Sequence, residues 1–349
     1  MPVLNELPRQ NLTLGDWAKR LDANGKIDKI VEILNQTNPM LQDVVWKEGN
    51  LPTGHKTTIR TGLPNVAWRK LYEGVQPSKS TTVQITDSCG MLESYSEVDK
   101  DLADLNGNTE QFRLSESQAF FEAMNQEMAT TLIYGNATEE PAKFTGLAVR
   151  YSELPGAKSA PSSQNVIDAG GATGALTSIW LVGWGDNSIH GIFPKGSKGG
   201  LSFEDKGQVT VQDDKGGYFE AYRAHIKWNA GLTVRDWRYA ARISNISVAD
   251  LEELSGTQAL NKKTSIIKLM SRAIDRLPSL DAVSPVFYVN RTVFSLLKIA
   301  AMEKTSNVLS IEQGLNQFGK RSSELVFDGV PVRKMDAITT DEAVVKATP

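Results

Sequence analysis

The side chains best suited to catalysis or metal binding are few in this 349-residue chain, and they are scattered along it. The three histidines, His55, His190 and His225, do not have the short spacing that brings two imidazoles to one metal ion. The single cysteine, Cys89, cannot form an intrachain disulfide, and we expect it to be a small buried apolar residue rather than a nucleophile. The sequence therefore predicts no metal site.

Neighbouring carboxylates and glycine-rich stretches give no further sign of an active site. Asp213 and Asp214 precede Lys-Gly-Gly, which is typical of a hairpin turn and too short for the regular ligand series of a calcium loop. The glycine-rich stretch 195–200 lacks the spacing of a phosphate-binding loop, and no Gly-x-Ser-x-Gly motif occurs. We predict no catalytic residue and no cofactor, although a site built from residues distant in sequence can escape such a search.

The charge balance argues against a dedicated nucleic-acid binder. The chain has 38 basic and 41 acidic residues, a formal net charge of −3, whereas phosphate binding calls for a basic excess. Its apolar stretches are far shorter than the roughly 18 residues of a membrane span, and its N-terminus is unlike a signal peptide. We expect no membrane association.

Two β-rich runs, 55–61 and 81–86, flank a turn-rich stretch and predict a long, wide hairpin. Trp68, Leu71 and Tyr72 lie near its tip, among charged residues. Because two strands cannot bury such side chains by themselves, we expect them to contact a neighbouring subunit. The alternative is a hairpin folded back on its own domain.

The clearest helix is predicted over residues 113–134. Ser115 and Gln118 have the spacing of a capping box. Apolar residues recur at steps of three and four, as expected for a helix with one buried face. This stripe consists of Phe121, Met124, Met128 and Leu132.

A second helix-like segment, 14–34, has few apolar points, among them Trp17. With so little apolar surface, we expect the segment to dock on another surface. The alternative is that it forms the first helix of the main domain.

Residues 177–245 are rich in β-formers and predict a meander of hairpins. We expect the strand 178–184 to return as 188–193, and 209–212 to pair with 218–228.

Residues 247–304 are predicted to be mainly helical, with Asn290 capping the last helix. Residues 325–345 return to β-structure. Together these patterns indicate an α+β fold.

Four stretches, 63–75, 182–197, 228–246 and 327–332, resemble stretches of short-tailed phage capsid proteins. The order of elements resembles the major capsid protein of tailed bacteriophages, which has the Hong Kong 97-type fold. The resemblance covers nearly the whole chain. It implies an N-terminal arm (1–50), an extended loop (51–98), a peripheral domain (99–176) with the spine helix 113–134, an axial domain (177–245), and axial and peripheral helices followed by peripheral strands (246–349).

The resemblance implies a structural protein that self-assembles into hexamers and pentamers of an icosahedral shell around double-stranded DNA, which the inner face would contact non-specifically. Implied partners are a portal protein, a separate scaffolding protein because the arm is short, and a decoration or cement protein. Assembly would take place in the bacterial host cytoplasm and end in the virion. The intersubunit contacts we predict are Trp17, Trp68, Arg69, Lys70 and Tyr72.

Two alternatives remain at this point. One is an encapsulin-type nanocompartment, which shares the fold but encloses an enzyme. The other is a cytoplasmic enzyme whose site is built from scattered residues.

Overall fold

The computed structural model describes residue 12 and residues 36–213, 215–249, 266–302, 309–315 and 321–348. Contacts divide the chain into two compact units. The first holds Met1–Asn35, Met91–Met128 and Gly200–Asn229; the second holds Gln36–Gly90, Ala129–Gly199 and Ala230–Pro349. The segment 177–245, which we expected to be one axial domain, therefore contributes to both units.

The second unit is built on a mixed sheet with the strand order β11-β12-β13-β10-β5, to which β9 and then β4 add beside β5. These strands are β11 (Leu309–Leu315), β12 (Arg321–Phe327), β13 (Val330–Lys334), β10 (Ser284–Val289), β5 (Leu176–Trp184), β9 (Ala240–Ser247) and β4 (Val166–Asp168). Every residue of β5 is buried, which fits its nearly continuous apolar sequence and its central place.

The predicted hairpin between 178–184 and 188–193 is wrong. β5 pairs antiparallel with β10 and β9 on its two sides, while β6 (Ile189–Phe193) meets it only at Trp184 and Ile189, in parallel. The hydroxyl of Ser188 donates to the carbonyl oxygen of Gly183 and holds a bend that redirects the chain. β6 pairs instead with β1 (Trp46–Glu48) and with the end of β8.

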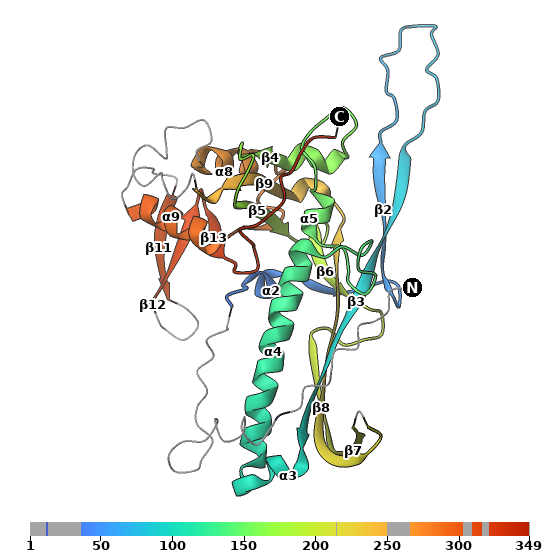
Figure 1. The fold of residues 1–349 in the computed structure, drawn as a ribbon. Helices are drawn as coiled ribbons and strands as arrows, with labels where there is room; N and C mark the ends of the chain where they lie inside the picture. The colour runs from blue at the N-terminus through green and yellow to red at the C-terminus, as the bar shows by residue number, and fades with distance from the viewer. Residues whose placement is uncertain are drawn as a thin grey trace. The chain divides into compact units, whose positions relative to one another are not determined.

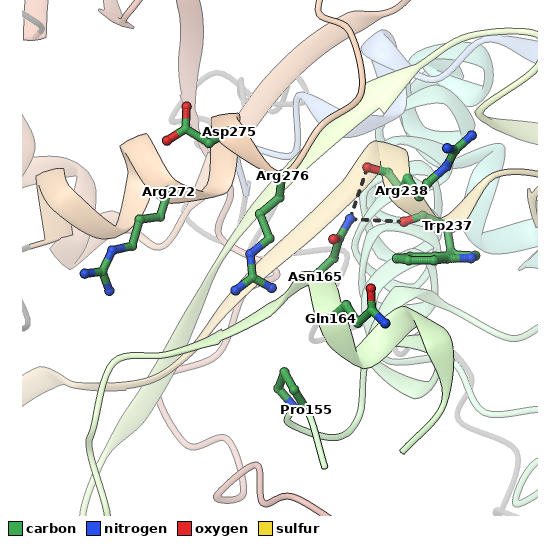
Figure 2. Close-up of a pocket in the computed structure, with 8 residues that line it drawn as sticks. All are labelled: Pro155, Gln164, Asn165, Trp237, Arg238, Arg272, Asp275 and Arg276. Carbon is green, nitrogen blue, oxygen red and sulfur yellow. Dashed lines mark hydrogen bonds between the residues drawn. The ribbon is translucent and has the colours of Figure 1, made fainter. Parts of the chain in front are cut away.

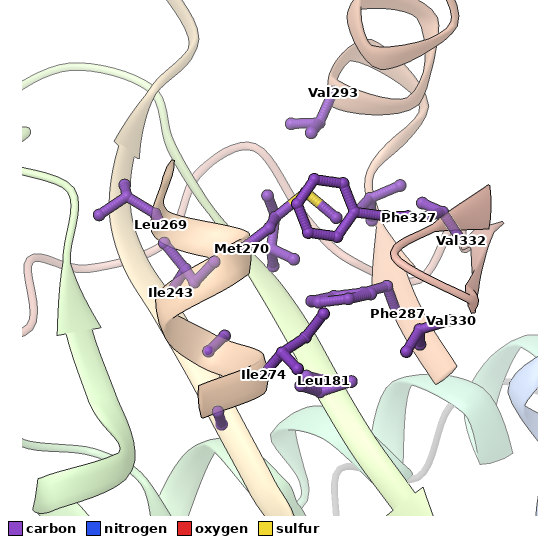
Figure 3. Close-up of a cluster of buried hydrophobic side chains, with 14 of the residues drawn as sticks. Leu181, Ile243, Leu269, Met270, Ile274, Phe287, Val293, Phe327, Val330 and Val332 are labelled. Atoms are coloured by element: carbon purple, nitrogen blue, oxygen red, sulfur yellow. The ribbon is translucent and has the colours of Figure 1, made fainter. Parts of the chain in front are cut away.

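Two helices, α8 (Ile266–Asp275) and α9 (Arg291–Met302), pack their apolar sides into the core of the second unit (Figure 3). The apolar stripe on α8 and the cap of α9 are as expected, since the Asn290 side chain accepts a hydrogen bond from the backbone N–H of Thr292. Phe287 and Phe327 meet edge to face, with ring centroids 5.9 Å apart. The smaller helices of this unit are α2 (Met40–Asp43), α5 (Leu147–Arg150), η2 (Pro161–Asn165) and η3 (Trp237–Tyr239).

The first unit contains most of helix α4 (Thr109–Tyr134), the hairpin of β7 (Leu201–Gln212) with β8 (Tyr218–Val234), and the second half of β3 (Thr81–Asp99) (Figure 1). The β7–β8 hairpin and its turn confirm the prediction for 209–228. Two short helices, α3 (Lys100–Ala103) and η1 (Leu105–Gly107), lead into α4. Leu12 packs against the cluster formed by Val98, Ala103 and Phe112.

Helix α4 begins earlier than predicted, at Thr109. Ser115 lies inside the helix, so its predicted capping role is wrong. The helical pattern continues toward the N-terminus because Phe112 is buried and extends the apolar side. Of the predicted stripe, Met124, Met128 and Leu132 are buried, whereas Phe121 is half-buried and meets Phe203 edge to face. No helix among the described residues is long and apolar enough to cross a membrane.

A buried ionic network holds the C-terminal segment against the sheet of the second unit. Arg242 donates to Glu342 at 2.8 Å, and both side chains are only 5% exposed. Arg242 also donates to the carbonyl oxygen of Tyr151 and lies over the Trp180 ring. The Tyr134 hydroxyl donates to Glu342 at 2.5 Å, and burial raises the pKa of this tyrosine.

We predict that Arg242→Met lowers the free energy of unfolding by about 3–5 kcal/mol, because it leaves the Glu342 carboxylate buried without its cation. The double variant Arg242→Met/Glu342→Leu should recover part of this loss. Urea titration measures both, and Lys100→Met, which removes a surface ion pair with Asp104, serves as the control with little change. A loss below about 1 kcal/mol in Arg242→Met would contradict the assignment.

Candidate assembly surface

The predicted extended hairpin is present in the second unit. β2 (Gly54–Gly62) pairs antiparallel with the first half of β3, from Gly54 opposite Ser88 to Gly62 opposite Thr81, with an irregularity in the register between Arg60 and Gly62. Residues 63–80 join the two strands. In Figure 1 they continue as a long loop beyond the ends of β2 and β3.

The side chains at the tip of this loop are fully accessible. Every residue from 63 to 86 is exposed, and the relative exposure of Trp68 and Tyr72 reaches 103% and 101%. No described side chain of the same unit covers them, so the loop is not folded back on its own unit. Leu63, Val66 and Leu71 add 80–91% exposed apolar side chains. Such a group on one projecting loop is characteristic of a binding surface.

Four of the five residues predicted to make intersubunit contacts lie together in this loop: Trp68, Arg69, Lys70 and Tyr72. The fifth, Trp17, lies outside the described residues. A turn closed by a hydrogen bond from the Glu73 N–H to the Lys70 carbonyl contains Tyr72 at φ 66°, which is uncommon for an aromatic residue. Their contact role stays a prediction, because the structure contains a single chain.

The base of the hairpin is anchored by the buried carboxylate of Asp87, which is 6% exposed. Its two oxygens accept hydrogen bonds from the guanidinium of Arg150 at 2.8 Å and from the hydroxyl of Thr233 at 2.5 Å. Arg150 also donates to the Leu232 carbonyl oxygen. This group could not be predicted from the sequence, because an Asp, an Arg and a Thr from β3, α5 and β8 have no common spacing.

Two glycines let the backbones approach closely at the same place. A Cβ at Gly54 would lie 2.0 Å from the Asp87 carbonyl oxygen, and one at Gly231 would lie 2.7 Å from that of Ser88. Any side chain at either position would push β2 or β8 away from β3. The base is therefore tightly packed, in contrast to the exposed tip.

Two histidines that are distant in sequence meet beside this base. The rings of His55 in β2 and His190 in β6 lie edge to face with centroids 6.0 Å apart. Burial lowers the pKa of His190 to about 4, and the nearby His55 and Arg235 contribute to the shift. Both rings are therefore neutral at pH 7. No group of three or more His, Cys, Asp or Glu side chains in the described parts of the chain could hold a metal ion.

We predict that the protein loses stability as the pH falls from about 6.5 to 4. In that window the unfolded chain binds a proton at His190 that the folded chain does not, and the loss reaches at most about 3 kcal/mol. Urea titrations at pH 7, 6 and 5 on wild type and His190→Gln measure it. The variant should show a smaller slope with pH, and an unchanged slope would contradict the role of His190.

We also predict that Asp87→Asn loosens the hairpin base. Hydrogen exchange of the β2 amides should become at least about tenfold faster, since the charged contact with Arg150 is lost. Asp186→Asn, which removes an exposed ion pair with Lys47, is the matched control. Equal exchange rates in the two variants would show that Asp87 is not the anchor.

Comparisons with known proteins agree on one family. The family model described as major capsid protein GP7 matches residues 22–346. A chain in the cryo-EM structure of bacteriophage Epsilon15 is 32% identical, with a TM-score of 0.76 over 98% of this chain and 99% of that one. No curated protein matches significantly.

More distant similarities are to a capsid chain of bacteriophage JBD30 (11% identity, TM-score 0.48, 86% of this chain and 91% of that one) and to an encapsulin complex from Synechococcus elongatus (15% identity, TM-score 0.40, 67% and 96%). The family match and the Epsilon15 similarity confirm the predicted Hong Kong 97-type fold and favour a phage shell over a nanocompartment or an enzyme. This chain belongs to the family of major capsid protein GP7, whose members are structural proteins of the virion shell.

Proposed function

We propose that the chain forms hexamers and pentamers that close an icosahedral shell around double-stranded DNA, with the loop 63–80 lying across the neighbouring subunit. The observation that carries this proposal is the full exposure of Trp68 and Tyr72 at the tip of a loop whose base is firmly anchored. Aromatic residues and arginine supply most of the binding energy in protein interfaces. A neighbour that covers the tip removes this apolar surface from water.

The contact is heterologous: the tip of one copy binds a different surface on the next. Such contacts close into rings when the rotation between copies is a simple fraction of a turn. Arg69 and Lys70 beside the two aromatic residues give the tip a local positive charge. We expect them to pair with carboxylates at the rim of the contact, where they contribute more to orientation than to affinity.

The N-terminal arm is proposed as a second connection between subunits, through Trp17. Leu12, which packs on the apolar cluster of the first unit, is consistent with an arm that finds apolar surface on capsid subunits. We assign residues 1–50 to this arm and 51–98 to the extended loop. We assign residues 99–176, which include helix α4, to the peripheral domain and residues 177–245 to the axial domain. Residues 246–349 would supply axial and peripheral helices and the peripheral strands.

Other partners follow from the role of a shell. The net charge of −3 suits an inner face that contacts packaged DNA without sequence preference and without tight binding. A portal protein, a separate scaffolding protein and a decoration or cement protein would complete the particle. Assembly would take place in the bacterial host cytoplasm.

Removal of residues 63–74 tests the loop directly. We expect a folded protein that forms no closed shells, because the deletion removes the tip but leaves the paired strands β2 and β3. Particles are counted by electron microscopy, and circular dichroism establishes folding. Normal shells from the deletion variant would contradict the proposal.

A double substitution at the tip tests the same contact without shortening the loop, so it separates the loss of the aromatic side chains from other effects of the deletion. Trp68→Ala/Tyr72→Ala should reduce shell yield at least about tenfold, because buried aromatic side chains supply much of the binding energy of an interface. Tyr218→Ala, which removes a 74% exposed aromatic side chain from β8, is the matched control.

A further inference from the structure

An open pocket of about 690 Å³ lies in the second unit between helix α8 and the two short helices η2 and η3 (Figure 2). Six of its eight lining residues are polar or charged, and three of these are arginines. The residues that line it are Pro155, Gln164, Asn165, Trp237, Arg238, Arg272, Asp275 and Arg276. The proposed function gives this pocket no role.

One wall of the pocket is held rigidly. Asn165 is 4% exposed, and its side-chain amide donates to the carbonyl oxygens of Arg238 at 3.0 Å and Ala240 at 2.8 Å. Asp236 accepts two hydrogen bonds from the Arg238 guanidinium and so neutralises this arginine within the chain. The turn that carries Trp237 is therefore fixed before any ligand arrives.

The opposite wall carries two arginines whose charge is not balanced. Arg272 lies on α8, and Arg276 directly follows the last residue of that helix. Within the described residues neither guanidinium group forms an ion pair or a hydrogen bond. The Asp275 carboxylate lies on the other side of the helix from both guanidinium groups (Figure 2). Burial and the charge of Arg272 lower the pKa of Arg276. The two like charges repel each other, so a bound anion between them would relieve an electrostatic cost that the free chain carries.

We propose that this pocket binds a carboxylate of a neighbouring copy of the chain, and that Asp328 supplies it. The inference rests on the proposed function, since it requires copies side by side in a ring. Guanidinium groups bind carboxylates through paired hydrogen bonds, which fix orientation as well as energy.

Strand directions place the pocket and Asp328 at the same end of the sheet. β5 is antiparallel to β9 and to β10, and β10 is parallel to β13, so β9, β10 and β13 all begin at one end. η3, which lines the pocket, leads directly into β9, and the turn at Asp328 and Gly329 leads into β13. The pocket and Asp328 thus lie at the same end of the strands, the pocket on the β9 side of β5 and Asp328 on the β13 side.

This arrangement suits a head-to-tail contact between copies in a ring, where one side edge of each sheet faces the other side edge of the next. Asp328 is exposed at the tip of its turn, with φ 49° followed by 77° at Gly329, as in a tight two-residue hairpin turn. A DNA phosphate is the competing anion. We favour the carboxylate because the pocket offers in a recess two cations that no described side chain pairs, whereas DNA binding draws on many basic groups spread over a surface.

Charge reversal tests the pairing. Arg272→Glu/Arg276→Glu should reduce shell yield at least about tenfold, and so should Asp328→Arg, because each places like charges together. The variant that combines all three changes should restore most of the yield. Lys298→Glu, an exposed charge reversal on α9, is the matched control and should assemble normally. Circular dichroism of each variant establishes folding.

A crosslink tests the same contact without a charge reversal. Shells with Arg276→Cys and Asp328→Cys should show disulfide-linked oligomers on non-reducing gels, and shells with Asp328→Cys alone should not.

Three results would overturn the proposal: normal yield from the arginine double variant, no rescue by the combined variant, or shells of the double cysteine variant without crosslinks. Normal shells with reduced DNA content in the arginine variant would assign the pocket to DNA instead. Wild-type protein that forms no shells would contradict the proposed function itself. If the wild type forms shells and the arginine double variant assembles equally well, only the pocket proposal is overturned.

Discussion

The buried ion pair between Asp87 and Arg150 is the constraint on which the extended hairpin depends. A loop that carries exposed Trp68 and Tyr72 gains nothing from burial within its own unit, so its direction has to be set at its base. The pair is 2.8 Å long, Asp87 is almost fully buried, and Thr233 takes the second carboxylate oxygen. Both oxygens of the Asp87 carboxylate therefore have a hydrogen-bond donor, and one amino group of Arg150 also donates to the Leu232 carbonyl oxygen, so that removal of either partner would leave a buried polar group without its bond.

The base and the tip of the extended hairpin differ in packing: the base is closely packed within the chain, whereas the tip exposes apolar side chains that could bind another copy. At the base, Gly54 and Gly231 allow backbone contacts that no side chain would tolerate. At the tip, apolar side chains remain in water, where each costs free energy that only another molecule can recover. In a protein that stays monomeric, such an exposed apolar surface would promote aggregation. A subunit whose tip is covered by a neighbour, as we propose here, would bury this surface in every copy.

Much of this design could be predicted from local sequence, and the reasons are local. The strands beside residues 63–80 and the β7–β8 hairpin were predictable because turn residues separate β-rich runs. The partners of β5 were not, because a strand buried on both faces has no alternation to show which strands lie beside it. The predicted start of α4 was too late. The capping-box spacing at Ser115 indicated a helix start there, whereas the buried Phe112, which lies earlier in the chain, extends the apolar side of the helix toward its N-terminus. Asp87 and Arg150 gave no signal, because each has its partner on a distant segment. Arg272 and Arg276 gave none, because the local sequence does not show which segments lie opposite them in the pocket.

The family to which this chain belongs consists of structural proteins, so its function depends on contacts between copies and not on a catalytic site. We propose two surfaces for contacts between copies: the apolar tip of the loop 63–80, and the pair Arg272 and Arg276, whose guanidinium groups pair with no described residue. They differ in what they demand. On this proposal the tip needs only an apolar neighbour of suitable shape, so it would supply affinity between many arrangements of copies. The arginine pocket would need one carboxylate at one place, so it would set the relative position of two copies. If both proposals hold, a closed shell uses both contacts, because affinity without a fixed position of the copies would give aggregates, and a fixed position without affinity would give no particle.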